Sequence, residues 1–120
     1  MVRAIIADDE ADSAEVFAEF LRIHKVDVLG IGKNGLEGVE LYKAHKPDIV
    51  FLDLAMPQYN GVYAAEKIKQ IDPRAKIVII SAYDPCIVKR QLAGIQVSGV
   101  LQKPYVLSEI QSVLYPKINA

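Results

Sequence analysis

The alternation of two kinds of segment constrains the fold of this chain more than any other sequence feature. Short runs of branched apolar residues lie at 2–7, 26–31, 48–52, 76–80 and about 99–101. Each run is followed by a segment whose apolar residues recur with the period of a helix. Strands that are apolar on both faces and alternate with helices indicate a parallel sheet covered on both sides. The sequence therefore predicts a five-stranded, doubly wound α/β fold with five helices.

The helical segments carry recognisable start and stop signals. Asn34 and Glu37 form a candidate capping box, and Asp84 places a cap before Pro85, which suits a first helical turn. Pro116 is expected to end the last helix and to keep it short. The apolar stripe of the first helix is Val16, Phe17, Phe20, Leu21 and His24, and that of the fourth is Val88, Gln91, Leu92 and Ile95.

Length and composition favour one domain, 1–120, and exclude several classes of protein. The chain has 120 residues, of which 52% are hydrophobic, and a formal net charge of −1. This charge gives no reason to expect direct nucleic-acid binding or an anionic membrane surface. The apolar runs are too short to span a bilayer, and Cys86 stands alone, which fits a reducing compartment. We therefore expect a cytoplasmic protein with no membrane contact.

Polar residues mark the ends of four predicted strands. Asp8 and Asp9 follow the first strand, Asp53 the third, Ser81 the fourth and Lys103 the fifth. In open parallel sheets the binding site lies outside the carboxyl ends of the strands, at the point where the strand order reverses. The flavodoxin-like order 2-1-3-4-5 would bring these four ends side by side, with the acidic residues flanking that point. We therefore expect these residues to form one site.

The residue types at this edge suggest phosphoryl chemistry. Three carboxylates and one ammonium leave an excess of negative charge that Mg²⁺ would neutralise. A metal-bound site of this kind favours transfer of a phosphoryl group onto a carboxylate, which gives an aspartyl phosphate. Asp53 is the candidate nucleophile because it stands alone on its strand, whereas Asp8 and Asp9 are paired. Ser81 and Lys103 would contact the phosphoryl oxygens.

At this point the chain resembles the receiver domains of response regulators in two-component signalling, the CheY-like superfamily, over essentially its whole length. The motifs that carry the resemblance are IIADDE, FLDLAMPQYNG, IISAYD and LQKPY. Their spacing is also similar to the family: Met56 and Pro57 follow Asp53 by three and four residues, and Gly61 follows it by eight. Each motif is weak alone, but together they are specific.

The resemblance implies a role for each site residue. Asp53 would accept a phosphoryl group from a sensor histidine kinase or a phosphotransfer protein, so the chain would catalyse only its own phosphorylation and dephosphorylation. Mg²⁺ would be held by Asp8, Asp9, Asp53 and the backbone carbonyl of Ala55. Ser81 would move toward the phosphoryl group.

The resemblance also implies how the signal leaves the domain. The movement would reach a partner protein through the helix around Val88, the strand at about 99–101 and the last helix. A stand-alone receiver of this kind would act either as a phosphorelay intermediate or as a chemotaxis-like messenger. The bond before Pro104 is expected to be cis, which is accessible to an X-Pro bond.

Three positions depart from the family pattern and are expected to tune switching. Val100 stands where many receivers have a Tyr or Phe that rotates on phosphorylation. The methyl group of Ala55 cannot steer an attacking water, whereas Tyr83 places a large ring beside the site. The chemotaxis receiver has polar residues at the latter two positions and an aromatic switch. We therefore expect a poor match to it and a better one to the single-domain receiver of the sporulation phosphorelay.

A second motif, GIGKNG at 30–35, favours a competing hypothesis. It matches G-x-G-x-x-G, follows a predicted strand and opens a helix, which is the context of a dinucleotide-binding fingerprint. In the order 2-1-3-4-5, however, its strand lies at the sheet edge, where no neighbouring strand end completes a crevice. A turn into the second helix is the simpler interpretation, and dinucleotide binding is kept as the alternative function.

Overall fold

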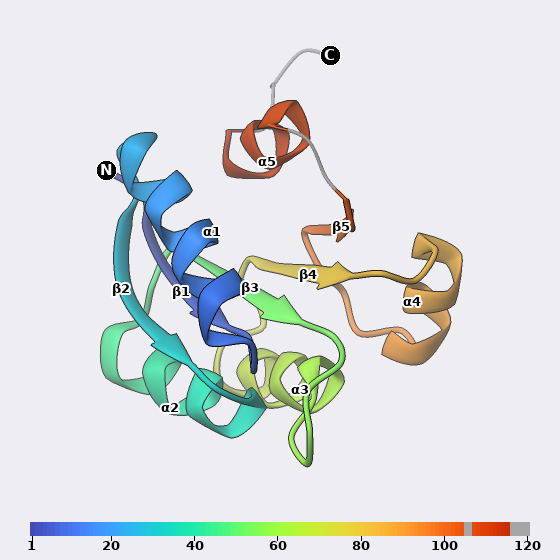
Figure 1. The fold of residues 1–120 in the computed structure, drawn as a ribbon. Helices are drawn as coiled ribbons and strands as arrows, with labels where there is room; N and C mark the ends of the chain where they lie inside the picture. Colours follow the sequence, from blue (N-terminus) through green and yellow to red (C-terminus); the bar gives the residue numbers. More distant parts are fainter. Residues whose placement is uncertain (105–106, 116–120) are drawn as a thin grey trace.

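Five parallel strands and five helices make up the computed structural model, which describes residues 1–104 and 107–115 (Figure 1). The strands are β1 (Arg3–Ala7), β2 (Asp27–Gly32), β3 (Ile49–Asp53), β4 (Ile77–Ser81) and β5 (Gly99–Gln102). The helices are α1 (Ala11–Ile23), α2 (Gly35–His45), α3 (Gly61–Ile71), α4 (Pro85–Leu92) and α5 (Leu107–Leu114). The sheet order is β2-β1-β3-β4-β5, so the predicted fold class and strand order are confirmed.

The central strands bury both of their faces, because successive side chains point to opposite sides of the sheet. In β1, Ile5 packs on the side of α2, α3 and α4, whereas Ile6 packs on the side of α1 and α5. In β3, Val50 and Phe51 divide in the same way, and every residue of β3 and β4 is buried. The sheet thus lies between two apolar clusters, with α2, α3 and α4 on one side and α1 and α5 on the other; Figure 1 shows these helices around the sheet.

Side-chain caps start three of the helices. Asn34, Asn60 and Asp84 accept backbone N–H bonds at the first turns of α2, α3 and α4, respectively. The predicted cap at Asp84 is confirmed. The capping box at α2 is shifted, because Glu37 accepts the N–H of Lys33 at 2.8 Å rather than that of Asn34. These bonds satisfy donors that would otherwise lack partners inside the helix.

Two members of the predicted apolar stripes, Val16 and Gln91, are exposed and lie outside the core. Val16 on α1 is 72% exposed, because the sheet contacts the neighbouring face that carries Phe17. Ile95 lies beyond α4, which ends before Ala93 in the left-handed conformation, but its side chain still packs against the core on the α4 side. The peptide bond between Lys103 and Pro104 is cis, as expected. Pro116, the predicted end of the last helix, lies outside the described residues, and α5 is eight residues long within them.

The GIGKNG motif forms the end of the edge strand β2 and the turn into α2. A Cβ added at Gly30 would lie 2.8 Å from Leu41 of α2, and one at Gly32 would lie 3.0 Å from Glu37. Gly32 therefore allows the backbone of α2 to approach the sheet closely, whereas Gly30 leaves room only for the flexible side chain of Leu41. Because β2 has a neighbour only on its β1 side, the motif faces no crevice between strand ends. Dinucleotide binding is not supported.

In the part of the chain that the structure describes, no helix has the length and apolar character required to cross a membrane.

Candidate functional site

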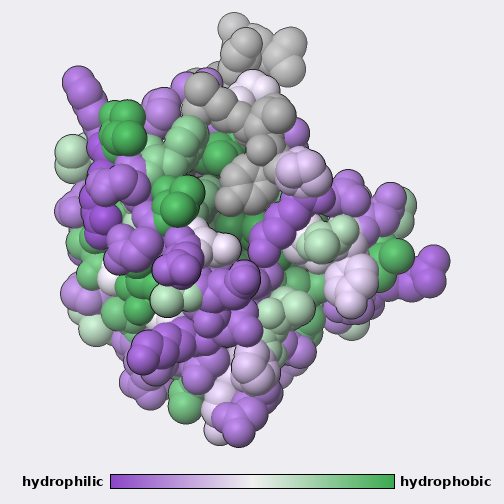
Figure 2. Space-filling view, in the orientation of Figure 1, coloured by the Kyte–Doolittle hydropathy of each residue, from purple (hydrophilic) through white to green (hydrophobic). Residues whose placement is uncertain are grey.

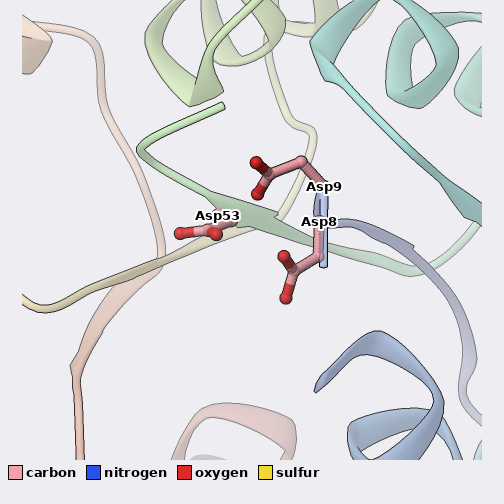
Figure 3. A group of neighbouring side chains, drawn as sticks. All are labelled: Asp8, Asp9 and Asp53. Atoms are coloured by element: carbon pink, nitrogen blue, oxygen red, sulfur yellow. The ribbon is translucent and has the colours of Figure 1, made fainter. Parts of the chain in front are cut away.

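Three carboxylates meet at the carboxyl edge of the sheet. Asp8 and Asp9 follow β1, and Asp53 is the last residue of the neighbouring strand β3. Figure 3 shows the three side chains extending into a common space from these two strand ends. One carboxylate oxygen from each residue lies within 4.8 Å of the others. The predicted juxtaposition of the acidic residues therefore occurs in the structure.

Burial gives Asp53 a different character from the other two acidic residues. Asp53 is 8% exposed, whereas Asp9 is exposed and Asp8 is half-buried. Burial raises the pKa of Asp53 to about 6; nearby Lys103 opposes the rise, and the charges of Asp8 and Asp9 add to it. Near neutral pH the carboxylate is still mostly ionised, although burial and the neighbouring carboxylates raise the free energy of its charged form. A cation bound beside Asp53 would stabilise this charged form.

Lys103 supplies a positive charge from β5's end. Its Nζ lies 3.8 Å from Oδ2 of Asp53, and its side chain is 40% exposed. Its backbone N–H donates to the carbonyl of Ser81 at 2.8 Å, which ties the loop after β5 to the end of β4. The ammonium is thus close enough to pair with Asp53 and remains open to an incoming anion.

Ser81 ends β4 and is 3% exposed. Its Oγ accepts the backbone N–H of Tyr83 at 3.0 Å. Because the oxygen is the acceptor in this bond, the O–H proton of Ser81 remains available to donate to another oxygen. The hydroxyl is therefore held at the site's edge with its donor function intact.

The three positions expected to tune the site differ in their surroundings. The ring of Tyr83 is half exposed and lines a shallow hollow of about 460 Å³ together with Ala55, Asn60 and Gln91. Ala55 is exposed in the loop after β3. Val100 is partly buried in β5, opposite Ile79 of β4, and packs against the core on the α4 side. Whether any of them tunes switching stays a prediction.

Backbone contacts hold the loop after Asp53, and sequence reasoning did not identify them. The N–H of Gly61 donates to the carbonyl of Leu54 at 3.0 Å, which closes this loop. A Cβ at Gly61 would lie 2.6 Å from the carbonyl oxygen of Asp53, so a larger residue would displace the end of β3. The spacing of Gly61 from Asp53 was visible in the sequence, but the contact was not.

A groove of about 740 Å³ opens beside the acidic cluster. Its lining includes Asp8, Asp53 and Lys103 at one end and apolar side chains of α1 and α5, such as Phe20 and Ile110, along its length. Figure 2 shows hydrophobic residues at the surface over α1, among hydrophilic neighbours. The phosphoacceptor candidate is therefore reached from solvent through a groove with a partly apolar wall.

The donor set fits a hard divalent cation. All three side chains offer carboxylate oxygens, the ligands that Mg²⁺ prefers. Three acidic side chains against one lysine also leave the negative excess that such an ion would neutralise. Asp8, Asp9 and Asp53 could therefore hold a divalent cation with bound waters in the remaining positions.

The chain is a doubly wound α/β domain with an acidic cluster at the switch point between β1 and β3, and a lysine after β5 reaches this cluster. Comparisons with known proteins identify the family of this domain. A family model described as the response regulator receiver domain matches residues 4–115. The chain belongs to this family. It is a signalling domain homologous to CheY and other response regulators.

Relatives and solved structures agree with this assignment. The chemotaxis protein CheY of Thermotoga maritima is 42% identical over 80 residues, covering 67% of each chain. CheY of Treponema pallidum is 35% identical over 118 residues, covering 93% of this chain and 82% of its own. The receiver domain of the putative regulator NarL from Mycobacterium tuberculosis is 30% identical, with a TM-score of 0.85, covering 94% and 93%.

A chain of the CheX–CheY–BeF3–Mg²⁺ complex from Borrelia burgdorferi shares the fold, with a TM-score of 0.85 at 24% identity, covering 94% of this chain and 86% of its own. CheY proteins are among the similar relatives over the sequence as a whole. The expected poor match to the chemotaxis receiver concerns Ala55, Tyr83 and Val100 alone, and it stays a prediction because overall identity does not test single positions.

Proposed function

We propose that this receiver domain accepts a phosphoryl group on Asp53, in a Mg²⁺-dependent reaction. The observation that carries the proposal is the burial of Asp53 between two further carboxylates and the Lys103 ammonium. A buried carboxylate that is ionised near neutral pH is a competent nucleophile.

The transfer needs positioning and charge neutralisation more than covalent assistance. An oxygen of Asp53 attacks the phosphorus of a phosphohistidine, the P–O bond forms and the P–N bond breaks, and the leaving imidazole takes up a proton. Lys103 pairs with one phosphoryl oxygen, and Ser81 donates its hydroxyl proton to another. Each of these side chains belongs to a different strand end, so the sheet itself sets their spacing.

Asp8, Asp9 and Asp53, together with the carbonyl of Ala55, would hold the Mg²⁺ ion. When bound, the ion supplies positive charge at the transferring oxygens and lowers the repulsion between carboxylates. The chain's contribution is the fixed set of oxygen donors and the lysine that completes the charge balance. Removal of either member of the acidic pair should therefore weaken both cation binding and phosphoryl transfer.

The partners follow from this chemistry. A sensor histidine kinase or a phosphotransfer protein would supply the phosphoryl group, and a downstream protein would read the phosphorylated state. We assign the output surface to α4, β5 and α5, because β5 carries Lys103 at its end and pairs with the strand that carries Ser81. A movement at the site would reach this surface through β5.

Labelling with acetyl phosphate tests the proposal. We expect Mg²⁺-dependent incorporation of one phosphoryl group into the wild type, read by a phosphate-affinity gel shift, and none into Asp53→Asn. Asp27→Asn, which changes an exposed aspartate at the start of β2, is the matched control and should label normally. Undiminished labelling of Asp53→Asn would overturn the assignment.

A further inference from the structure

The GIGKNG motif has no role in the proposed reaction, yet its residues 32–35 contact both the loop that begins at Asp8 and the loop that follows Asp53. The carbonyl of Gly32 accepts the backbone N–H of Asp8 at 3.0 Å. Three residues later, the N–H of Gly35 donates to the carbonyl of Tyr59 at 2.6 Å. Tyr59 lies in the loop 54–60, between Asp53 and α3. The turn from β2 to α2 therefore bridges the two loops that supply the candidate cation ligands.

The neighbouring loop requires the glycine at position 35. A Cβ there would lie 2.6 Å from the carbonyl oxygen of Asn60 and 2.7 Å from that of Tyr59. Both are backbone atoms, so no side-chain rotation can make room. Gly35 is also the first residue of α2, and its backbone lies outside the left-handed region. The local backbone conformation alone would therefore accept an alanine. The close approach of the loop, not the backbone of Gly35, is the constraint.

The loop 54–60 is also held by contacts with α3, the helix that follows it directly in the chain. The side chain of Asn60 caps α3 by accepting the N–H of Tyr63 at 2.9 Å, and the rings of Tyr59 and Tyr63 pack with centroids 5.0 Å apart. These contacts tie the end of the loop to α3. The bond from Gly35 adds a tie from a different element, and this tie relates the loop to β2 and, through Gly32, to Asp8.

We propose that the β2–α2 turn is a positioning clamp for the cation site and that Gly35 is its positioning residue. Its N–H and its missing Cβ set the place of the loop 54–60, which carries the Ala55 carbonyl, relative to Asp8. This inference rests on the proposed function. Mg²⁺ demands near-ideal octahedral geometry, whereas Ca²⁺ accepts variable geometry and longer bonds. A small displacement of the loop should therefore weaken Mg²⁺ binding more than Ca²⁺ binding.

Calorimetric titration of three proteins with Mg²⁺ and with Ca²⁺ tests the clamp. For Gly35→Ala we expect about a tenfold loss of Mg²⁺ affinity, because substitutions of residues that support metal ligands without binding the metal cause losses of this size. The loss of Ca²⁺ affinity should be clearly smaller. Gly30→Ala is the matched control, because it adds the same methyl group within the same motif. Its Cβ meets only the flexible end of Leu41, so both affinities should match the wild type.

The possible outcomes distinguish a failure of the clamp proposal from misfolding of the variant and from a failure of the proposed function. A folded Gly35→Ala protein with unchanged Mg²⁺ affinity, or with equal losses for Mg²⁺ and Ca²⁺, overturns the clamp. If Gly35→Ala does not fold, an ester in place of the Gly35 amide removes the N–H without adding a Cβ and carries the same expectations. A wild type that binds no Mg²⁺ overturns the proposed function, and the clamp with it.

Discussion

At the residue scale, Asp53 is a carboxylate held in an electrostatically unfavourable place. It is buried at the end of β3 beside two further carboxylates, and Lys103 approaches one of its oxygens at 3.8 Å. Desolvation and like charge both disfavour the ionised form, whereas the ammonium favours it. The net result is a raised pKa, so the ionised Asp53 carboxylate lowers the stability of the folded domain.

The raised pKa makes a prediction for stability in metal-free buffer. The pKa of Asp53 is about 6 in the folded protein against 3.8 for the free group, so between these values the folded state binds more protons. The free energy of unfolding should therefore fall as pH rises through this window. We expect Asp53→Asn to be more stable than the wild type by about 1–3 kcal/mol at pH 7, measured by urea unfolding with chelator.

The advantage of Asp53→Asn should shrink toward zero near pH 4, where the wild-type carboxyl is protonated in the folded state. A difference that stays constant between pH 4 and pH 7 would show that the raised pKa is not its source. Asp27→Asn, the surface control, should show no such pH dependence.

Tyr83 makes a second prediction at this scale. Its half-exposed ring stands beside the hollow lined by Ala55, while its backbone N–H holds the hydroxyl of Ser81. We expect the ring to shield the acyl phosphate from water, so Tyr83→Ala should lose its phosphoryl group several-fold faster than the wild type. The decay rate of phosphorylated protein after removal of acetyl phosphate measures this.

Tyr83→Phe keeps the ring and should decay at the wild-type rate. The alanine variant retains the backbone N–H to Ser81, so faster decay would report the ring rather than the hydrogen bond. Equal decay of the alanine variant and the wild type would refute shielding.

At the element scale, the N-terminal caps of α3 and α4 also hold the loops after β3 and β4, which lie beside the candidate site. Asn60 ends the loop after β3 and caps α3, and Asp84 follows the loop after β4 and caps α4 by accepting the N–H of Cys86 at 2.8 Å. Each loop is therefore fixed at one end by a strand inside the sheet and at the other by a capped helix. This arrangement holds functional loops in place on a rigid scaffold.

Loss of the α3 cap should be measurable. We expect Asn60→Ala to lower the free energy of unfolding by about 1 kcal/mol, because the N–H of Tyr63 loses its acceptor. Chemical denaturation monitored by circular dichroism gives the value. Asn60→Asp keeps an acceptor oxygen and adds a favourable charge at the helix N-terminus, so it should retain wild-type stability. Equal destabilisation by both variants would rule out the cap as the cause.

At the scale of the whole molecule, the sheet collects acidic and basic groups from strands far apart in sequence. Lys103 and Asp53 are fifty residues apart along the chain, and Ser81 lies between them. The order β2-β1-β3-β4-β5 places their strands next to one another. Repulsion at this edge opposes folding in the absence of a cation, so cation binding and global stability should be linked.

This linkage predicts that Mg²⁺ stabilises the entire domain. At a concentration about one hundred times the dissociation constant, Mg²⁺ should raise the free energy of unfolding by about 2.7 kcal/mol. Thermal unfolding with and without Mg²⁺, at ionic strength matched with NaCl, measures the gain. Asp9→Asn should reduce the gain by removing a ligand. A shift reproduced by NaCl alone would mean that screening, not binding, is responsible.

Much of the fold could be predicted because apolar patterning acts locally. The runs that became β3 and β4 are buried on both faces, and this shows in the sequence as uninterrupted branched residues. The positions of Asp53 and Ser81 at strand ends followed from the same runs. The exposure of Val16 could not be predicted, because the width of the buried stripe on α1 depends on how the helix lies against the sheet.

The sequence by itself determined the strand–helix alternation and the residues that end each strand, since both depend on local hydrophobic periodicity. Only the tertiary structure decided what the glycines of the GIGKNG motif do. Gly35 meets Tyr59 twenty-four residues later, through a backbone contact that leaves no signature in either side chain. Long-range backbone packing of this kind is set by the whole assembly of sheet and helices, so the same motif that suggests a dinucleotide fingerprint bridges two loops of a receiver site.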